Sequence, residues 1–83
     1  MTWVIKETKQ ATKFLAKNLI NHLDLYISRA IKKAILKEDV NIDIKKMKGE
    51  WKGYYRIKQG DLRIILKFDT QNEIVFIHKI GWR

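Results

Sequence analysis

The sequence predicts an α+β fold with the element order β-α-α-β-β-β, in which two helices pack on one face of a small, mostly antiparallel, twisted sheet. Two observations predict this arrangement. Apolar residues recur at helical spacing in the first half of the chain and alternate with polar residues in the second half, with the change near Ile44. The 83 residues contain no linker-like stretch, so residues 1–83 are expected to form a single domain.

The first half of the chain predicts a short strand and two amphipathic helices. Residues 2–5 are the expected strand, and residues 7–18 form the first expected helix, with Ala11, Phe14 and Leu15 on its apolar face. The second helix is expected to end near residues 37–39. Its apolar residues recur three and four apart: Leu23, Ile27, Ala30, Ile31, Ala34 and Ile35. Asn18 and Asn21 are the expected break and N-cap between the helices.

The second half predicts three strands joined by tight turns. Residues 54–58 alternate in polarity, and residues 59–61 form a short connection to a second alternating run. In that run one face carries Leu62, Ile64, Leu66 and Phe68, whereas the other carries Arg63, Ile65 and Lys67. Residues 69–72 form a turn, and residues 74–80 are apolar on both faces, which is typical of an interior strand. On that reading His78 is mostly buried.

Net charge is the clearest functional signal in the composition. The chain carries 18 Lys and Arg against nine Asp and Glu, a formal charge of +9. Residues 44–83 hold ten of the bases and four of the acids, a net +6, so this half is the expected contact surface. Such a charge favours phosphate-rich partners. The alternative is a soluble, lysine-rich protein without a polyanionic partner.

Several classes of protein are excluded by the composition. There is no cysteine and no apolar run of 18 residues, so we expect neither disulfides nor a membrane span. Two histidines without cysteine make a metal site unexpected, and no cofactor is implied. The apolar N-terminal patch is too short for a signal peptide, which predicts a cytoplasmic location.

A cluster of basic side chains is predicted on the sheet face away from the helices. Alternation places Arg56 and Lys58 on one face of their strand, and a hairpin would bring Arg63 beside them. Arg83 can join this group after the last strand. Gathered like charges repel unless a polyanion binds them, although a solvated outer face is the plain alternative. The rim of the cluster is expected to hold Lys45, Lys46, Lys48, Lys52, Trp51 and Trp82, the two tryptophans either stacking on bases or closing a small core.

Four short motifs in this half resemble the RelE/ParE toxin superfamily, and RelE more closely than ParE. They are KMKG at residues 46–49, GYYRIK at residues 53–58, GDLRII at residues 60–65 and IGWR at residues 80–83. The resemblance implies the toxin of a type II toxin–antitoxin module. RelE-like members bind the ribosomal A site and cleave mRNA without a metal, the 2′-hydroxyl attacking the adjacent phosphate to leave a 2′,3′-cyclic phosphate. It also implies a cognate antitoxin as partner.

By position in the motifs, the resemblance implies catalytic roles for Arg56, Lys58, Arg63 and Arg83. The closing motif has Trp82 where the family usually has histidine. The RelE pattern continues into a tail with a catalytic tyrosine, and no residue here matches it. We therefore expect slower cleavage. Fast cleavage would direct the search for a proton-transfer group to Lys58, Tyr54 and His78.

The sequence leaves two other functions open. A ParE-like protein shares the fold but inhibits DNA gyrase and cuts nothing. A non-catalytic nucleic-acid-binding module would use the same basic face without chemistry.

Overall fold

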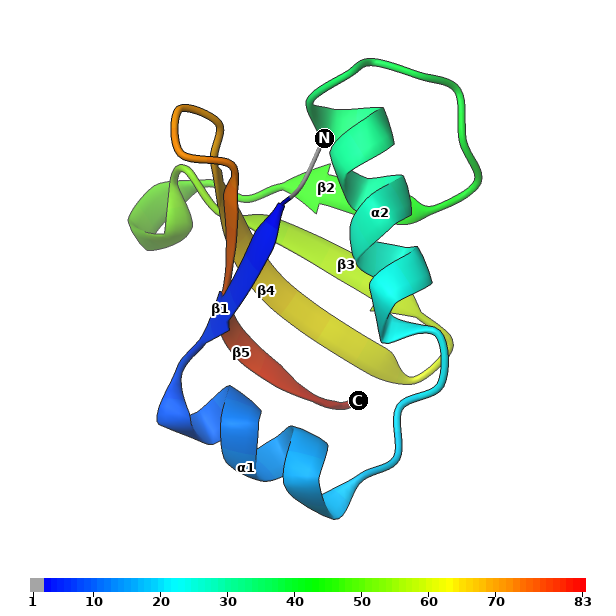
Figure 1. Ribbon diagram of the computed structural model, residues 1–83, viewed down its shortest axis with the longest axis vertical. Coiled ribbons are helices and arrows are strands. Elements are labelled where there is room, and N and C mark those ends of the chain that lie inside the picture. The colour runs from blue at the N-terminus through cyan, green and yellow to red at the C-terminus, as the bar shows by residue number, and fades with distance from the viewer. Residues whose placement is uncertain (1–2) are drawn as a thin grey trace.

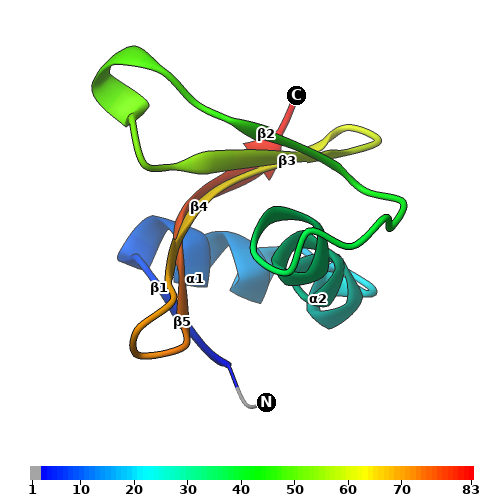
Figure 2. The same ribbon diagram turned by 90° about the horizontal axis from the view of Figure 1, so that it is seen from above.

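The computed structural model describes residues 3–83 and confirms the predicted fold class. In chain order the elements are β1 (Val4–Glu7), α1 (Lys9–Lys17), α2 (Leu23–Ala34), β2 (Asp43–Lys46), the 3-10 helix η1 (Gly49–Trp51), β3 (Tyr55–Gln59), β4 (Leu62–Asp69) and β5 (Ile74–Trp82). The strands form one sheet in the order β1-β5-β4-β3-β2. Only β1 and β5 pair in parallel. Both helices lie on the same side of this curved sheet (Figures 1 and 2).

The two helices begin for different local reasons. Thr8 caps α1, because its hydroxyl oxygen accepts a hydrogen bond from the backbone N–H of Ala11. The same hydroxyl donates to the carbonyl of His78 at 2.7 Å, which ties the start of α1 to β5. The predicted break at Asn18 is confirmed, since Asn18 is the C-cap of α1. The predicted N-cap at Asn21 is wrong, because His22 takes that position with a left-handed φ of 67° and no capping hydrogen bond from its side chain.

Two strands differ from their predictions. The first strand is Val4–Glu7, two residues later than expected, and Thr2 lies outside the described residues. β2 was not predicted, because Ile44 is the only apolar residue in its four and gives no visible alternation. Pairing with β3 holds these residues in a strand, with Ile44 directly opposite Ile57. The sheet therefore has five strands where the sequence predicted four.

The core lies between the helices and the sheet. Its fully buried sheet residues are Ile57, Ile64, Leu66, Val75, Ile77 and Ile80. Ala11 of α1 and Ala30 of α2 are also fully buried, and their small side chains let both helices approach the sheet closely. No helix of the described residues is long and apolar enough to cross a membrane.

A β-bulge in β5 changes the face on which its last residues lie. Leu66 of β4 pairs with Ile77, but the preceding Ile65 pairs with Lys79, so His78 is an extra residue in β5. Ile77 and Ile80 both point into the core, although strict alternation would separate them. The expectation that His78 is mostly buried is confirmed, because its side chain is of intermediate exposure. It lies on the face opposite the helices, where alternation from the buried Ile77 places it.

Candidate nucleic-acid interface

The predicted basic cluster lies on the outer face of the sheet, the face opposite the helices. Lys58 of β3 lies directly opposite Arg63 of β4, and Arg56 shares their face because it is two residues from Lys58. The alternate residues Ile57 and Ile64 point the other way and are 0% exposed. A two-residue turn, in which Gly60 has a φ of 59°, fixes the register that brings Lys58 and Arg63 together.

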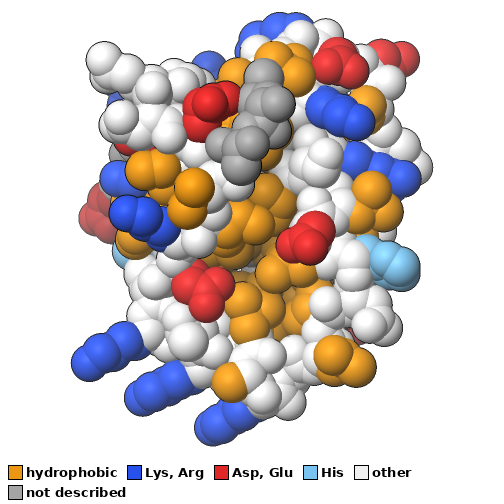
Figure 3. All heavy atoms as spheres, in the orientation of Figure 1, with side chains coloured by type: hydrophobic (Ala, Val, Ile, Leu, Met, Phe, Trp, Pro, Cys, Tyr) orange, Lys and Arg blue, Asp and Glu red, His pale blue; other side chains and the backbone are white. Residues whose placement is uncertain are grey.

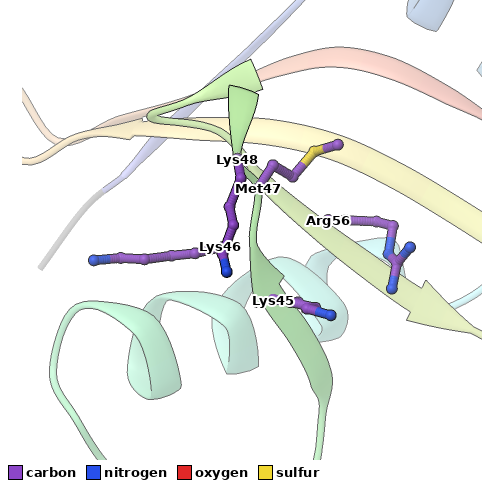
Figure 4. A pocket seen from close by; sticks show the side chains of 5 residues that line it. All are labelled: Lys45, Lys46, Met47, Lys48 and Arg56. Carbon is purple, nitrogen blue, oxygen red and sulfur yellow. The ribbon is translucent and has the colours of Figure 1, made fainter. Parts of the chain in front are cut away.

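Arg56 is the most enclosed member of the cluster. Its Nε is buried and has no hydrogen-bond partner among residues 3–83. The side chain lines a cavity of about 280 Å³ together with Lys45, Lys46, Met47 and Lys48. Figure 4 shows Lys45 and Arg56 extending to the same side of the sheet from neighbouring strands, whereas Lys46 extends the other way. Three lysines and an arginine line this cavity, so it is suited to a bound anion.

The Arg63 guanidinium and the Arg83 backbone both lie at the turn between β3 and β4. Nη1 of Arg63 donates to the carbonyls of Gly60 at 2.6 Å and Leu62 at 3.0 Å, which holds the guanidinium at the end of the hairpin. The backbone N–H of Arg83 donates to the Asp61 carbonyl at 2.7 Å, so the ladder continues to Arg83. Because of the bulge, alternation from Ile80 puts Arg83 on the outer face, whereas unbroken alternation from Ile77 would put it on the helix side.

Gly81 lies directly opposite Arg63. A Cβ at Gly81 would meet no atom within 4 Å, so the space beside the Arg63 side chain is open. The outer face therefore offers three strand positions for phosphate contacts, Arg56, Lys58 and Arg63, with Arg83 at the end.

An aromatic cluster that the sequence did not predict lies beside these cations. The ring of Trp51 is 5.4 Å from Tyr54 and 5.1 Å from His78 between centroids, and the Tyr54–His78 distance is 5.4 Å. Nζ of Lys67 lies 5.4 Å from the Tyr54 ring and 5.7 Å from the Phe76 ring. Tyr54 is two residues from Arg56 on the same face, so proton-carrying side chains adjoin the arginine cavity. Alternation from the buried Ile77 puts His78 on this face, and the bulge keeps Lys79 there as well.

The other predicted residues do not all join the cluster. Lys46 lies opposite Tyr55, on the helix side of the sheet, and Lys52 lies in the loop after η1. Trp82 is 54% exposed and packs on α1: its ring is 5.6 Å from that of Phe14, and its Nε1 donates to Asn18. The Trp82 ring thus lies on the helix side of the sheet, and the Arg56 cavity lies on the other side.

The turn between β4 and β5 lowers the pKa of Asp69. The side chain and the backbone N–H of Asn72 both donate to the Asp69 carboxylate, at 2.9 and 3.1 Å, and these bonds lower the pKa of Asp69. The carboxylate thereby orders the turn rather than neutralising the basic cluster.

Replacing Lys45 by threonine is expected to stabilise the fold while weakening anion binding. Lys45 is exposed and lies directly opposite Arg56, so like charges face each other across β2 and β3. Removing the repulsion, with a residue that favours strands, is expected to raise the free energy of unfolding by about 0.2–1 kcal/mol at low salt. The measurement is urea unfolding at low and high ionic strength, and the gain should shrink as salt screens the charges.

Lys79→Thr is the matched control for this prediction. Lys79 is also exposed on a strand, but its cross-strand neighbour is the uncharged Ile65. It should give a smaller, salt-insensitive change. An equal gain from both variants would mean that strand propensity, and not repulsion in the cluster, is responsible.

The helix side of the molecule carries an apolar groove. Figure 3 shows this side, with hydrophobic side chains gathered in a hollow near the centre of the view. A cavity of about 450 Å³ between β1 and α2 is lined by Ile5, Ile27, Ile31 and Leu36, with Asp24 and Lys32 at its rim. Leu36 and Ile5 remain 43% and 37% exposed, so apolar surface is left open here.

Within residues 3–83 no three His, Cys, Asp or Glu side chains gather in a way that could hold a metal ion.

Comparison with solved structures shows many proteins of the same fold. Scans against models of protein families and against curated proteins find no match. A chain of the archaeal RelE–RelB complex from Pyrococcus horikoshii OT3 is 26% identical, with a TM-score of 0.65, covering 100% of this chain and 97% of that one. A chain of the RelB–RelE antitoxin–toxin complex from Methanococcus jannaschii is also 26% identical, with a TM-score of 0.65 and coverage of 94% and 89%.

A third similar structure is a chain of the toxin–antitoxin complex RelBE2 from Mycobacterium tuberculosis, which is 16% identical. Its TM-score is 0.69 and each chain is covered completely. The matches span both helices and all strands, whereas the resemblance in sequence covers only the second half. The chain therefore has the fold of the RelE superfamily of toxins from type II toxin–antitoxin systems.

Proposed function

We propose that this protein is the toxin of a type II toxin–antitoxin module and an endoribonuclease that cleaves mRNA on the ribosome. The observation that carries the proposal is the outer face of the sheet, where Arg56, Lys58 and Arg63 lie together with no apolar cover. The fold shared with RelE chains supports it. The protein would act in the cytoplasm, in the A site, where single-stranded mRNA is exposed.

The cations would bind the RNA backbone and stabilise the transition state. When the 2′-hydroxyl attacks the adjacent phosphorus and the 5′-oxygen leaves, negative charge accumulates on the non-bridging oxygens. Arg56, Arg63 and Arg83 offer planar donors that fit two oxygens at once, and Lys58 supplies a further positive charge. The product is a 2′,3′-cyclic phosphate, and the reaction needs no metal.

Proton transfer is assigned to Tyr54 and His78. Attack requires a base that removes the proton of the 2′-hydroxyl, and departure requires an acid that protonates the 5′-oxygen. These two rings lie 5.4 Å apart between centroids, on the face that carries Arg56. Lys58 is a third group on this face, and its ammonium binds phosphate in the proposal. The sequence placed all three among the candidates, and the contact between the Tyr54 and His78 rings favours the pair.

A cognate antitoxin is the proposed partner. Two of the solved chains that share this fold come from complexes of RelE with RelB. An antitoxin with an amphipathic segment could bury its apolar side chains in the groove lined by Ile27, Ile31 and Leu36. Acidic residues elsewhere on the antitoxin would neutralise the outer face.

Inducible expression with separate readouts of translation and replication tests the proposal. We expect rapid arrest of amino-acid incorporation while DNA synthesis continues at first, and purified protein should leave gyrase supercoiling unchanged. Arg56→Ala should relieve the arrest, and Lys13→Ala on the exposed face of α1 should not. Arrest of replication with inhibited supercoiling would instead identify a gyrase inhibitor. Binding of RNA without arrest would identify a non-catalytic module.

Binding of single-stranded RNA is expected to weaken steeply with salt. If three phosphates are neutralised, the logarithm of the binding constant falls with a slope of about −2 against log salt, at roughly −0.7 per phosphate. The double variant Arg56→Glu, Arg63→Glu should flatten the slope. Lys9→Glu, Lys13→Glu on α1 is the charge-matched control, and fluorescence anisotropy is the measurement. If both double variants flatten the slope equally, net charge and not the outer face governs binding.

A further inference from the structure

A second basic cavity lies at the end of the sheet, outside the cluster described above. It has a volume of about 610 Å³ and forms where η1, the start of β3 and the β4–β5 turn meet. Lys46, Lys48 and Lys52 line it on one side, and Tyr55, Phe68 and Thr70 line it on the other. Its size lies within the range of small-molecule sites.

The lining of this cavity is suited to a flat ring next to negative charge. The rings of Tyr55 and Phe68 lie 5.2 Å apart between centroids, at 60° to each other, and both are only partly buried. No Asp or Glu is among the lining residues, whereas three lysines are. An aromatic wall beside ammonium groups is the combination that binds a nucleobase together with its phosphates.

The cavity shares three lining residues with the cavity of Arg56, namely Lys46, Met47 and Lys48 at the end of β2. Tyr54 lines the second cavity while its ring contacts His78 in the aromatic cluster. Residues 46–48 therefore offer positive charge to an RNA strand that runs from Arg56 around the end of β2 to the second cavity.

We propose that this cavity is a nucleotide-binding subsite for the RNA strand whose scissile phosphate lies at Arg56. A base lies against Tyr55 and Phe68, and Lys46, Lys48 and Lys52 hold the flanking phosphates. The proposal rests on the function proposed above, since it gives the same RNA a second point of contact. Lys46 and Lys52, which the sequence placed at the rim of the basic cluster, find their role here and not on the outer face.

Thr70→Glu tests the subsite directly. Thr70 is an exposed turn residue, so a carboxylate there enters the cavity without disturbing the core. The neighbouring Gln71 is exposed in the same turn and does not line the cavity, so Gln71→Glu adds the same charge as a control. The Asn72–Asp69 bonds hold the turn in both variants. Circular dichroism confirms that each variant folds.

The readout is anisotropy with an RNA decamer and with a dinucleotide. We expect Thr70→Glu to lower the affinity for the decamer about tenfold and Gln71→Glu to lower it less than twofold. Neither variant should change the affinity for the dinucleotide, which binds at Arg56. Equal effects of the two variants on the decamer would overturn the subsite. An equal loss of affinity for a poly-glutamate peptide in Thr70→Glu would also overturn the subsite, because it would show that the cavity recognises charge and not a base.

The experiment separates the subsite from the proposed function. Arg56→Ala should weaken the binding of both the decamer and the dinucleotide. If Arg56→Ala weakens both and Thr70→Glu weakens neither, only the subsite is overturned. If the unmodified protein binds neither RNA, both proposals fail.

Discussion

Arg56→Ala and Arg63→Ala are each expected to slow mRNA cleavage on ribosomes by about 10²–10³-fold, the usual cost of losing one preorganised donor to a transition-state oxyanion. Arg56 is half-buried and lines the outer-face cavity with Lys45 and Met47, where its planar guanidinium can meet a phosphate. Arg63 is held by two carbonyls at the hairpin end, which fixes the direction of its remaining donors. The measurement is single-turnover cleavage at saturating protein.

Two controls distinguish lost chemistry from lost structure. Neither side chain belongs to the core, and the alternate residues Ile57 and Ile64 carry the packing, so urea unfolding should change little. Arg56→Lys keeps the charge but not the planar pair of donors, and it should restore only part of the rate. Full activity in the lysine variant would show that charge alone is needed at this position.

Tyr54→Phe and His78→Phe are expected to lower the cleavage rate by about 10²–10⁴-fold, the range for general acid–base assistance. Each variant keeps a ring in the cluster formed with Trp51, so packing changes little. Binding of RNA should stay within about twofold, because the phosphate contacts belong to the arginines and lysines. Each variant should also remove one limb of the pH–rate profile, which a structural role would not do.

Trp51→Phe is the matched control for the proton-transfer pair. It alters the same aromatic cluster but removes no group that exchanges protons at neutral pH. The rate and the shape of the pH profile should be retained. A profile unchanged in Tyr54→Phe and in His78→Phe would assign proton transfer elsewhere, with Lys58 as the remaining candidate on this face.

The hairpin of β3 and β4 shows what the sequence could predict. Its strands alternate without interruption and its turn has two residues, so the pattern alone determined which side chains share a face. Arg56, Lys58 and Arg63 were placed together for that reason. In a regular strand the side chains alternate between the two faces along the whole length, and all three residues lie on the expected face.

The bulge in β5 shows why the rest could not be predicted. Alternation from Val75 and Ile77 would put Arg83 on the helix side, and the extra residue at His78 reverses that parity. The bulge arises from pairing with β4, a long-range contact that no local pattern records. The same limit hid β2, whose register depends on β3, and the second cavity, whose walls come from four separate segments.

Mapping the ends of an mRNA cleaved on ribosomes tests the central claim most directly. Purified protein is added to ribosomes stalled on a defined mRNA, and the RNA ends are located and characterised. We expect cleavage within the A-site codon without added metal, leaving a 2′,3′-cyclic phosphate and a 5′-hydroxyl. These ends should be absent with Arg56→Ala. Intact mRNA at saturating protein, or ends bearing a 5′-phosphate, would contradict it.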